Sequence, residues 1–191
     1  MDFSAFSHGQ IHSKLWLCET LEPLLPKNPK IIILASWYNT LGMMLVIRNP
    51  KKYKRILGID KDIKSSTVAN HICDAWMINA DQIIKNENKL VEEFNSKDFA
   101  NFDVIINTSV EDITTKEWFN KIPKSKMIVL QTCNLLPDVA QQYNNWNILD
   151  PNPSFEIFKN KYPMKKILFE GEKQFDYGDL KYSRYMLIGK K

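Results

Sequence analysis

Short polar and acidic side chains follow the most apolar segments of this sequence, and their types suit the binding of hydroxyl groups. Asp60 closes an apolar run, and its carboxylate offers only acceptors, which match the two hydroxyl donors of a ribose diol. The other role for an acid at this point is to cap the next helix, for which Asp62 or Ser65 would serve equally well. The sequence marks Asp60 as the first candidate for ligand binding.

Four further residues could do chemistry at the ends of apolar runs. Glu111 and Asp112 could act as a general base or bind a cation, although the helix dipole alone also favours acids there. Asn107 is a polar residue that ends an apolar run. Asp81 could accept from an adenine amino group, or it could cap the helix that follows.

Aromatic, histidine and basic residues give weaker signals. The rings of Trp37 and Tyr38 could stack on a ligand or pack in the core. His8 and His12 are four residues apart, but no third ligand is near, so we expect no metal site. The basic run 51–55 could bind phosphate, but a solvated helix end is the commoner fate of such residues.

Short apolar runs alternate with helical patterns and must position these residues. Strands are predicted at 31–34, 55–60, 76–81, 102–107 and 126–131. Helices are predicted at 8–25, 41–47, 64–76, 82–96, 115–121 and 155–161, the last capped by Ser154, and 132–153 is predicted to be irregular. Two longer runs, 164–172 and 182–189, predict a hairpin.

This alternation predicts an α/β fold: a mostly parallel, seven-stranded, Rossmann-like sheet with helices on both faces and a C-terminal antiparallel hairpin. In such sheets ligands bind beyond the carboxyl ends of the strands, so the candidate residues should meet at one edge. The 191 residues suit one compact domain with one core.

Composition and missing motifs exclude several classes of protein. No apolar stretch is long enough to span a membrane, no signal peptide is visible, and three cysteines without paired spacing favour reduced thiols in the cytoplasm. The sequence has no P-loop, no GxSxG turn and no HExxH motif. The net charge of +4 permits nucleic-acid binding but supports it only weakly.

The order of elements over 30–191 resembles the class I S-adenosylmethionine-dependent methyltransferases, with 1–29 as an N-terminal helical extension. In that family the loop after the first strand contacts the cofactor, which here implies Ala35, Ser36, Trp37 and Tyr38. The other implied cofactor contacts are Asp60, Lys61, Ala80, Asp81, Asn107 and Thr108.

The sequence departs from the family pattern in its first loop. Where the family has an acid and then a GxGxG turn, this chain has Ile33 and then Ala35, Trp37 and Asn39. A loop with side chains approaches a ligand less closely than glycines allow. The segment 107–110 also lacks the [DN]PP[YF] pattern of amino-directed DNA methylases, which disfavours a DNA base as acceptor.

The resemblance implies methyl transfer from S-adenosyl-L-methionine to an acceptor that we expect to be a small molecule. Glu111 or Asp112 would orient or deprotonate that acceptor. Two alternatives stay open: a non-catalytic or accessory protein on the same fold, and an enzyme that uses the same cofactor for another reaction. We expect no membrane partner, and the sequence predicts no oligomeric state.

Overall fold

A computed structural model describes residues 2–76, 83–144, 146–177 and 180–191 of the chain. In the described residues, seven strands form one mixed sheet in the order β3-β2-β1-β4-β5-β7-β6, in which β7 runs antiparallel to its neighbours β5 and β6. The strands are β1 (Lys30–Leu34), β2 (Arg55–Asp60), β3 (Ile84–Asn88), β4 (Val104–Asn107), β5 (Met127–Cys133), β6 (Lys166–Tyr177) and β7 (Leu180–Lys190).

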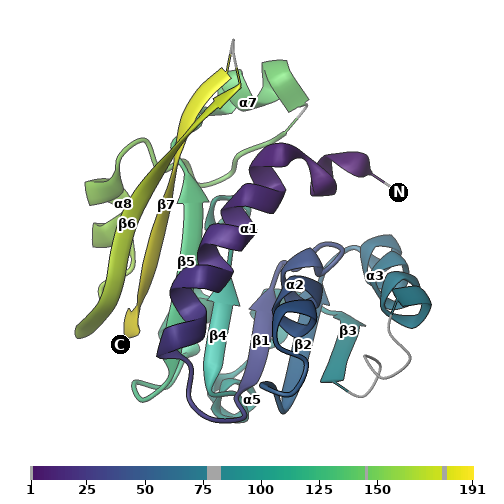
Figure 1. Ribbon diagram of the computed structural model, residues 1–191. Helices are drawn as coiled ribbons and strands as arrows, with labels where there is room; N and C mark the ends of the chain where they lie inside the picture. The colour runs from purple at the N-terminus through teal and green to yellow at the C-terminus, as the bar shows by residue number, and fades with distance from the viewer. Residues whose placement is uncertain (1, 77–82, 145, 178–179) are drawn as a thin grey trace.

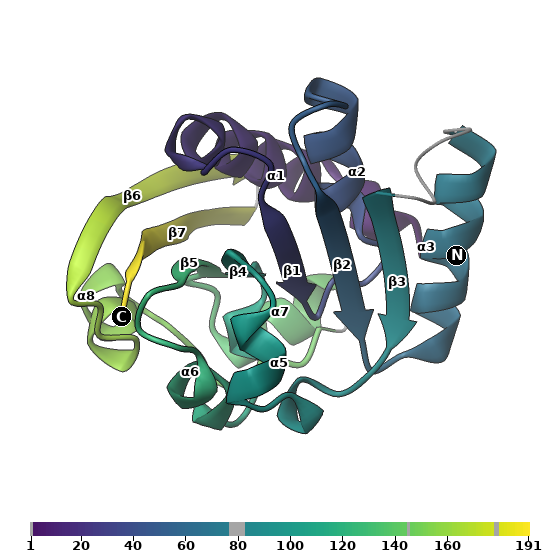
Figure 2. The same ribbon diagram turned by 90° about the horizontal axis from the view of Figure 1, so that it is seen from below.

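Helices cover both faces of the sheet (Figure 1 and Figure 2). On one face lie α1 (His8–Leu21), α2 (Thr40–Arg48) and α3 (Ile63–Trp76), and on the other lie α5 (Ser96–Ala100), α6 (Glu117–Lys121) and α8 (Phe155–Lys161). α7 (Pro137–Asn144) lies beside the tip of the hairpin. Short 3-10 turns occur at η1 (Phe3–Phe6), η2 (Glu22–Leu24), η3 (Val91–Glu93) and η4 (Val110–Asp112).

The central strands are buried on both faces because their residues are almost all apolar. β1 pairs in parallel with β2 and β4, so that Leu34 lies between Ile59 and Asn107 at the carboxyl edge. Two large apolar clusters, one on each face, fill the space under the helices. Leu17 and Leu21 of α1 are fully buried in one of them, so the N-terminal helix contributes to the same core.

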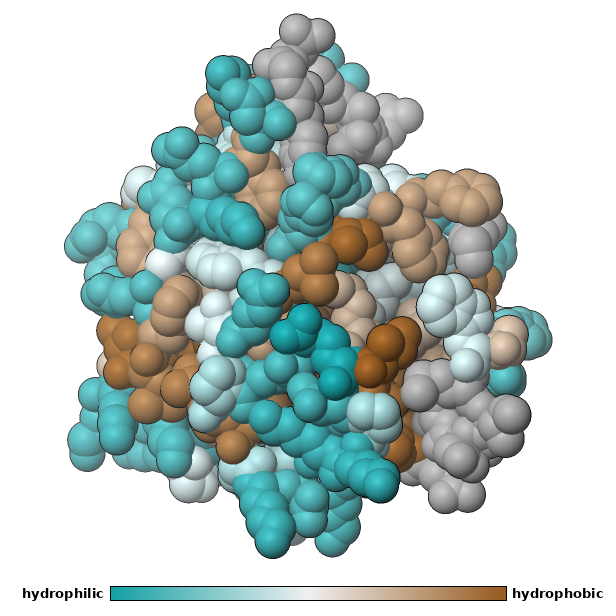
Figure 3. Space-filling view, viewed as in Figure 1, coloured by the Kyte–Doolittle hydropathy of each residue, from teal (hydrophilic) through white to brown (hydrophobic). Residues whose placement is uncertain are grey.

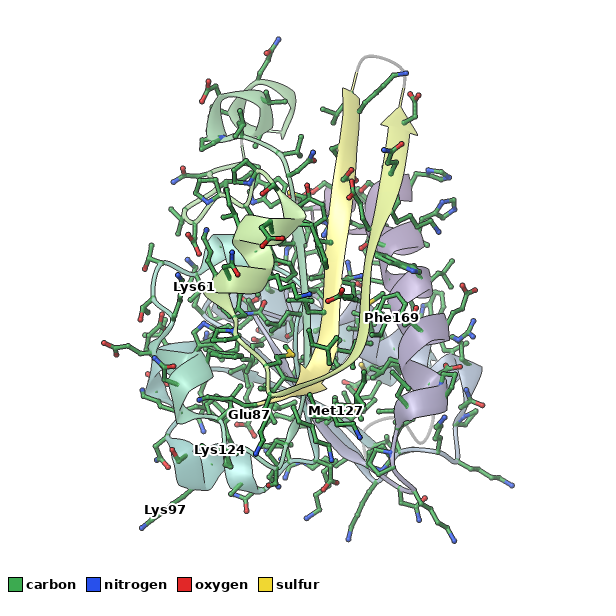
Figure 4. The ribbon with its side chains drawn as sticks, turned by 90° about the vertical axis from the view of Figure 1, so that its left-hand side faces the viewer. Lys61, Glu87, Lys97, Lys124, Met127 and Phe169 are labelled. Atoms are coloured by element: carbon green, nitrogen blue, oxygen red, sulfur yellow. The ribbon has the colours of Figure 1, made fainter. Side chains whose placement is uncertain are left out.

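The C-terminal hairpin extends the sheet and carries charged residues to its carboxyl edge. β7 runs antiparallel to β5, and this register sets Arg184 opposite Cys133. Figure 4 places Phe169 on the side of the hairpin that faces α1, where its ring meets the Trp16 ring edge-on at 6.2 Å. This contact fixes α1 against the hairpin.

The predicted sheet is confirmed in its class, its hairpin and four of the five expected parallel strands, but the third strand was placed wrongly. Trp76 ends α3, residues 77–82 lie outside the described residues, and the strand is Ile84–Asn88. The helix predicted over 82–96 is therefore also wrong. β3 is polar and lies at the edge of the sheet, where Ile84 and Asn86 face inward and Lys85 faces solvent.

Two helix boundaries also differ from expectation. The predicted helix 8–25 ends at Leu21, and the 3-10 turn η2 with Pro23 follows it. The segment predicted to be irregular contains α7, a mostly polar helix whose start at Pro137 suits a first helical turn. Ser154 caps α8 as predicted, since its Oγ accepts from the Ile157 amide at 3.3 Å.

The surface over α1 mixes polar and apolar side chains (Figure 3). Among the side chains drawn in colour, hydrophilic groups separate small apolar areas. Within the described residues, no helix has the length and apolar character needed to cross a membrane.

Candidate functional site

The loop after β1 has left-handed backbone at every second residue. Ala35, Trp37 and Asn39 have φ angles of 48°, 52° and 50°. These are the positions where the resembling family carries glycine, and L residues reach this region only at a cost of ~1–2 kcal/mol each, with Asn the least penalised. The loop therefore keeps the backbone of a glycine-rich turn although its residues have side chains.

Asp60 holds this loop at the carboxyl edge of β2. Its carboxylate accepts a hydrogen bond from the Trp37 amide at 2.7 Å and from the Asp62 amide at 2.9 Å, one on each oxygen. The Ser36 amide donates to the Ile59 carbonyl at 2.9 Å. Asp60 is partly exposed, and each carboxylate oxygen has a second lone pair, so the group can still accept from hydroxyl donors.

Asn39 locks the far end of the loop. Its Oδ1 accepts from the Gly42 amide at 3.1 Å and caps α2, while its Nδ2 donates to Asn86 Oδ1 at 2.7 Å. Gly58 lies beneath this pair, and a Cβ there would come within 2.6 Å of Asn39 Nδ2 and 2.8 Å of Ser36 Oγ. We call residues 35–39 with Gly58, Asp60 and Asn86 the loop site.

Aromatic rings cover the outer side of the loop site. The Trp37 and Tyr38 rings stack with centroids 5.3 Å apart, and Phe6 stacks on Tyr38 at 6.4 Å. The Asp2 amide donates to the Tyr38 hydroxyl at 2.8 Å. Tyr38 is buried, so its ring packs in the core, whereas Trp37 is partly exposed, so its ring can contact a ligand.

The predicted adenine contacts, Ala80 and Asp81, lie outside the described residues. The end of β3 instead brings Asn88 beside the loop site, where its Nδ2 donates to the carbonyls of Asp60 and Lys61 at 3.0 and 2.9 Å. Asn88 was missed because its strand was predicted as a helix. Lys61 itself is exposed.

Asn107 and Thr108 are buried at the end of β4, next to the loop site. Asn107 Oδ1 accepts from the Ser109 amide at 2.9 Å. Its Nδ2 has no hydrogen-bond partner among the described residues. A buried donor without a partner is costly, so this amide is available to a ligand.

Glu111 is a buried carboxyl group in the turn η4. Burial, followed by the neighbouring charge of Asp112, raises the pKa of Glu111 to about 8. Neither carboxylate oxygen has a hydrogen-bond partner within the described part of the chain. The amides of Leu149 and Asp150 both donate to the Glu111 carbonyl at 2.9 Å, which fixes the backbone of the turn.

Asp112 is held more firmly than Glu111. Its Oδ1 accepts from Trp146 Nε1 at 2.8 Å. Burial nevertheless raises the pKa of Asp112 above its ordinary value. The two predicted acids are thus brought together with different environments, one bonded and one without a partner.

Two buried cations complete this part of the edge. Arg184 is 4% exposed. Burial opposes its charge, but the neighbouring Cys133 and Glu111 and a side-chain hydrogen bond with Tyr182 raise its pKa above the ordinary value. Lys14 of α1 is 7% exposed, and burial, followed by the charge of Arg184, lowers its pKa to about 7. We call Lys14, Glu111, Asp112 and Arg184 the charged cluster.

Sequence reasoning missed both cations, although each left a signal. Lys14 lies between Ile11 and Cys18 at helical spacing, on the stripe that faces the core. Arg184 directly precedes the apolar run 185–188 of β7 and is buried with it. A charged residue on a face that is predicted to lie in the core would have indicated each of these buried cations.

Other features of the molecule do not add to the site. Cavities of about 400 Å³, lined by Asp103 and Lys126 among others, and about 230 Å³, lined by Tyr162 and Met164 among others, lie away from both the loop site and the charged cluster. The rings of His8 and His12 have centroids 3.7 Å apart. No cluster of three metal-binding side chains occurs in the ranges that the structure describes.

An adenosine-containing cofactor fits the loop site by its donors and acceptors. Asp60 retains acceptor capacity for ribose hydroxyls, and the left-handed backbone presents the loop as a glycine-rich turn would. The unpartnered Nδ2 of Asn107 adds a buried donor at the next strand end. The Trp37 side chain leaves less space for a cofactor to approach the loop backbone than a glycine would.

Comparison with known proteins identifies the fold. No family model and no curated protein matches the sequence. Among solved structures, the chain is similar to MccD protein, with a TM-score of 0.70, 10% identity and coverage of 96% of this chain and 98% of that one.

Two named methyltransferases are also similar. Geranyl diphosphate methyltransferase in complex with SAM has a TM-score of 0.65 at 8% identity, covering 94% of this chain and 84% of that one. Coclaurine N-methyltransferase bound to N-methylheliamine and SAH has a TM-score of 0.68 at 9% identity, covering 95% and 72%. The chain therefore has the fold of the class I S-adenosylmethionine-dependent methyltransferases.

Proposed function

We propose that this protein transfers a methyl group from S-adenosyl-L-methionine to a small-molecule acceptor. The observation that carries the proposal is the loop site: alternate left-handed residues aim the Trp37 amide at Asp60, at the strand edge where open α/β sheets bind ligands. This backbone is retained without glycine, although it is strained at Ala35 and Trp37.

The loop site would hold the cofactor through groups already fixed in place. Asp60 would accept from the ribose hydroxyls, and the loop 35–39 would face the amino-acid end. When bound, the cofactor supplies an electrophilic methyl group on a sulfonium centre. Positioning of the acceptor and exclusion of water would then account for most of the rate.

Glu111 would receive the proton of the acceptor. Its pKa of about 8 is close to neutrality, which suits a general base. Asp112, held by Trp146, would fix the turn that carries Glu111. Glu111 is therefore the proposed catalytic residue, and Asp112 is a positioning residue.

Two of the similar structures favour a small-molecule acceptor for this proposal. Geranyl diphosphate methyltransferase and coclaurine N-methyltransferase are both named for small molecules. The charged cluster of this chain is enclosed, which suits a small acceptor better than a nucleic acid.

Calorimetric titration with S-adenosylhomocysteine tests the proposal. We expect saturable binding, weakened by ~1–3 kcal/mol in Asp60→Ala because the ribose hydroxyls and the Trp37 amide lose their acceptor. Asp62→Ala is the matched control: Asp62 caps α3 by accepting from the Lys64 amide and Ser65, so this variant should lose stability but keep its affinity. Absence of heat at millimolar ligand with folded protein would refute the proposal.

A second function is favoured by the side chains of the loop. Trp37 and Asn39 occupy positions that glycines hold in the resembling family, which favours an accessory protein that does not bind the cofactor. Trp37→Gly separates the two functions. If the side chain excludes the cofactor, the variant should gain affinity for S-adenosylhomocysteine, whereas equal or weaker binding supports a ring that contacts the ligand.

A further inference from the structure

Basic residues gather at the amino edge of the sheet, in the loops that enter the strands and in the residues that flank those loops. The described part of this edge contains fourteen of the 26 lysine and arginine residues of the chain but one of its 22 acids, Asp103. The net charge of +4 is therefore the balance of a strongly basic region and an acidic remainder of the chain. We call this region the basic edge: residues 26–30, 48–55, 101–103, 121–126, 163–166 and 190–191.

The strand registers place part of the basic edge in one row across the sheet. Lys30 of β1 pairs with Arg55 of β2. Further along the sheet, Lys190 of β7 pairs with both Met127 of β5 and Lys166 of β6. Neighbouring strands lie ~4.8 Å apart, so the five steps from β2 to β6 span ~24 Å. The cations therefore form an extended row and not a single point of positive charge.

Some lysines of the basic edge are held by backbone carbonyls, which satisfy their hydrogen bonds but not their charge. Lys126 Nζ donates to the Ala100 carbonyl at 2.7 Å, and Lys191 Nζ donates to the Asn120 carbonyl at 2.8 Å. The carboxyl ends of helices favour cations, which explains why these two lysines lie there. Burial, followed by the charge of Lys124, lowers the pKa of Lys191, so like charges lie near one another at this edge.

The exposed lysines of the basic edge have no acidic partner. Lys54, Lys124 and Lys166 are exposed and form no ion pair with any residue that the structure describes. Within the described residues one ion pair involves the basic edge, and it joins Arg48 to Glu22 at 2.9 Å. Because unpaired like charges repel one another, a polyanion that binds here relieves that repulsion.

The basic edge has a hollow but no exposed apolar patch. A cavity of about 400 Å³ is lined by Asp103, Lys126 and Lys190 among others. None of the large apolar side chains that are exposed in the described residues belongs to the basic edge. Protein interfaces have an apolar core, membrane-surface segments insert apolar side chains, and single-stranded nucleic acids stack on aromatic rings. A nucleic-acid duplex requires none of these, since lysine and arginine bind it through its phosphates.

We propose that the basic edge binds the phosphate backbone of a double-stranded nucleic acid. A duplex carries one negative charge per ~1.7 Å of its axis, so a row of ~24 Å faces several phosphates at once. Contacts to phosphate carry no sequence information, so binding is independent of sequence. The basic edge lies at the opposite ends of the strands from the loop site. This duplex is therefore not the methyl acceptor, and the inference is independent of the proposed function.

Fluorescence anisotropy with a labelled duplex of about 20 base pairs tests the inference. We expect binding at low salt, with an affinity that falls at least tenfold between about 50 and 150 mM sodium chloride because counterions are released. The triple variant Lys54→Gln, Lys124→Gln, Lys166→Gln removes three exposed charges of the basic edge. It should bind at least tenfold more weakly, and its salt dependence should fall by ~2–3 in the slope of log affinity against log salt.

A second triple variant is the matched control, because it removes the same total charge elsewhere on the surface. Lys64→Gln, Lys116→Gln and Lys173→Gln replace exposed lysines that lie outside the basic edge. This control should keep the affinity within about twofold and should keep the wild-type salt dependence. Equal weakening in the two triple variants would assign the binding to overall charge and overturn the proposal, as would absence of binding by the wild type at low salt.

Three competing ligands distinguish the duplex from other polyanionic partners. Polyglutamate has one charge per ~3.3 Å of extended chain, so it should bind more weakly than the duplex. The matching single strand and vesicles that contain phosphatidylserine should also bind more weakly. Tighter binding of any of the three would overturn the proposal. Both triple variants should bind S-adenosylhomocysteine as the wild type does, and duplex binding without any binding of that compound would refute the proposed function alone.

Discussion

The loop site and the charged cluster lie on the same edge of the sheet but satisfy their polar groups differently. In the loop site Asp60, Asn39 and Asn86 bond to one another's segments. In the charged cluster Glu111 and Arg184 have atoms without partners among the described residues. A region whose polar groups are hydrogen-bonded to one another has its shape before a ligand binds. A region with unpartnered polar groups can form its missing hydrogen bonds with a ligand. The loop site is therefore the hydrogen-bonded half of this edge, and the charged cluster is the half with unsatisfied polar groups.

Titration of Glu111 should give the largest effect, because it lies in the unsatisfied half. Its pKa is raised from 4.5 to about 8 on folding, so between these values the folded state holds a proton that the unfolded state has released. Stability from this group is therefore present at low pH and is lost as pH rises, by up to ~1.4 kcal/mol per unit.

Glu111→Gln should lack this pH-dependent loss of stability. Because Lys14 is present in both proteins, its own titration cancels when the variant is compared with wild type. The variant should gain relative stability from pH 5 to pH 8, measured by urea unfolding at several pH values. Parallel stability profiles of the two proteins would mean that Glu111 is ionised and bonded, and the contrast between the two halves would disappear.

Gly58→Ala should give the next largest effect, in the bonded half. The new Cβ would approach Asn39, Asn86 and Ser36 within 2.8 Å, and relief requires the hydrogen bond between the two asparagines to break. We expect a loss of ~2–3 kcal/mol in the free energy of unfolding. Gly171→Ala is a useful control, since its Cβ would meet the ring of Phe169 on the hairpin and leave the loop intact. A Gly58→Ala loss below that of the control would show that the loop is loosely packed.

Asn39→Ala should cost ~2 kcal/mol, because it removes the cap of α2 and the bond to Asn86 and leaves a left-handed alanine. Asn39→Gly removes the same bonds but suits the backbone. It should therefore be more stable than Asn39→Ala by ~1 kcal/mol. Denaturant unfolding of the pair measures the difference, and equal stability would argue against a left-handed residue 39.

Ala35→Gly should give the smallest effect and the opposite sign. Glycine relieves the left-handed strain, but it also increases the entropy of the unfolded chain. The balance should stabilise the protein by ~0.5 kcal/mol, measured as a shift in the denaturant midpoint. A destabilisation would mean that the packing of Ala35 against the core outweighs its backbone strain.

The sequence was sufficient for the sheet because apolar runs determine buried strands. The runs around Ile32, Leu57, Ile105 and Val129 are almost continuous, and such runs fit only the interior of a parallel sheet. β3 escaped prediction because an edge strand has one exposed face and needs little apolar surface. Its inward Asn86 is held by hydrogen bonds that no sequence pattern reveals.

From the sequence, a site residue could be predicted only where it directly follows a recognisable strand, because the end of the strand then fixes its place in the fold. Asp60 ends a recognisable strand, and its place at the edge followed from that alone. Lys14 and Arg184 are 170 residues apart, and they meet only because α1 crosses the sheet beside β7. A pairing of this kind depends on tertiary packing, so single residues could be noticed but not assigned to one cluster.

The path of the N-terminal segment has one mechanical consequence. Asp2 touches Tyr38 above the loop, and further along the same segment Ser13 lies 3.3 Å from Gln131, beside Lys14. Two helical segments, η1 and α1, joined at the extended residue Ser7, thus connect the two halves. If an occupant of one half shifts this segment, the contacts at the other half change with it, so we expect occupancy of the two halves to be energetically coupled in both directions.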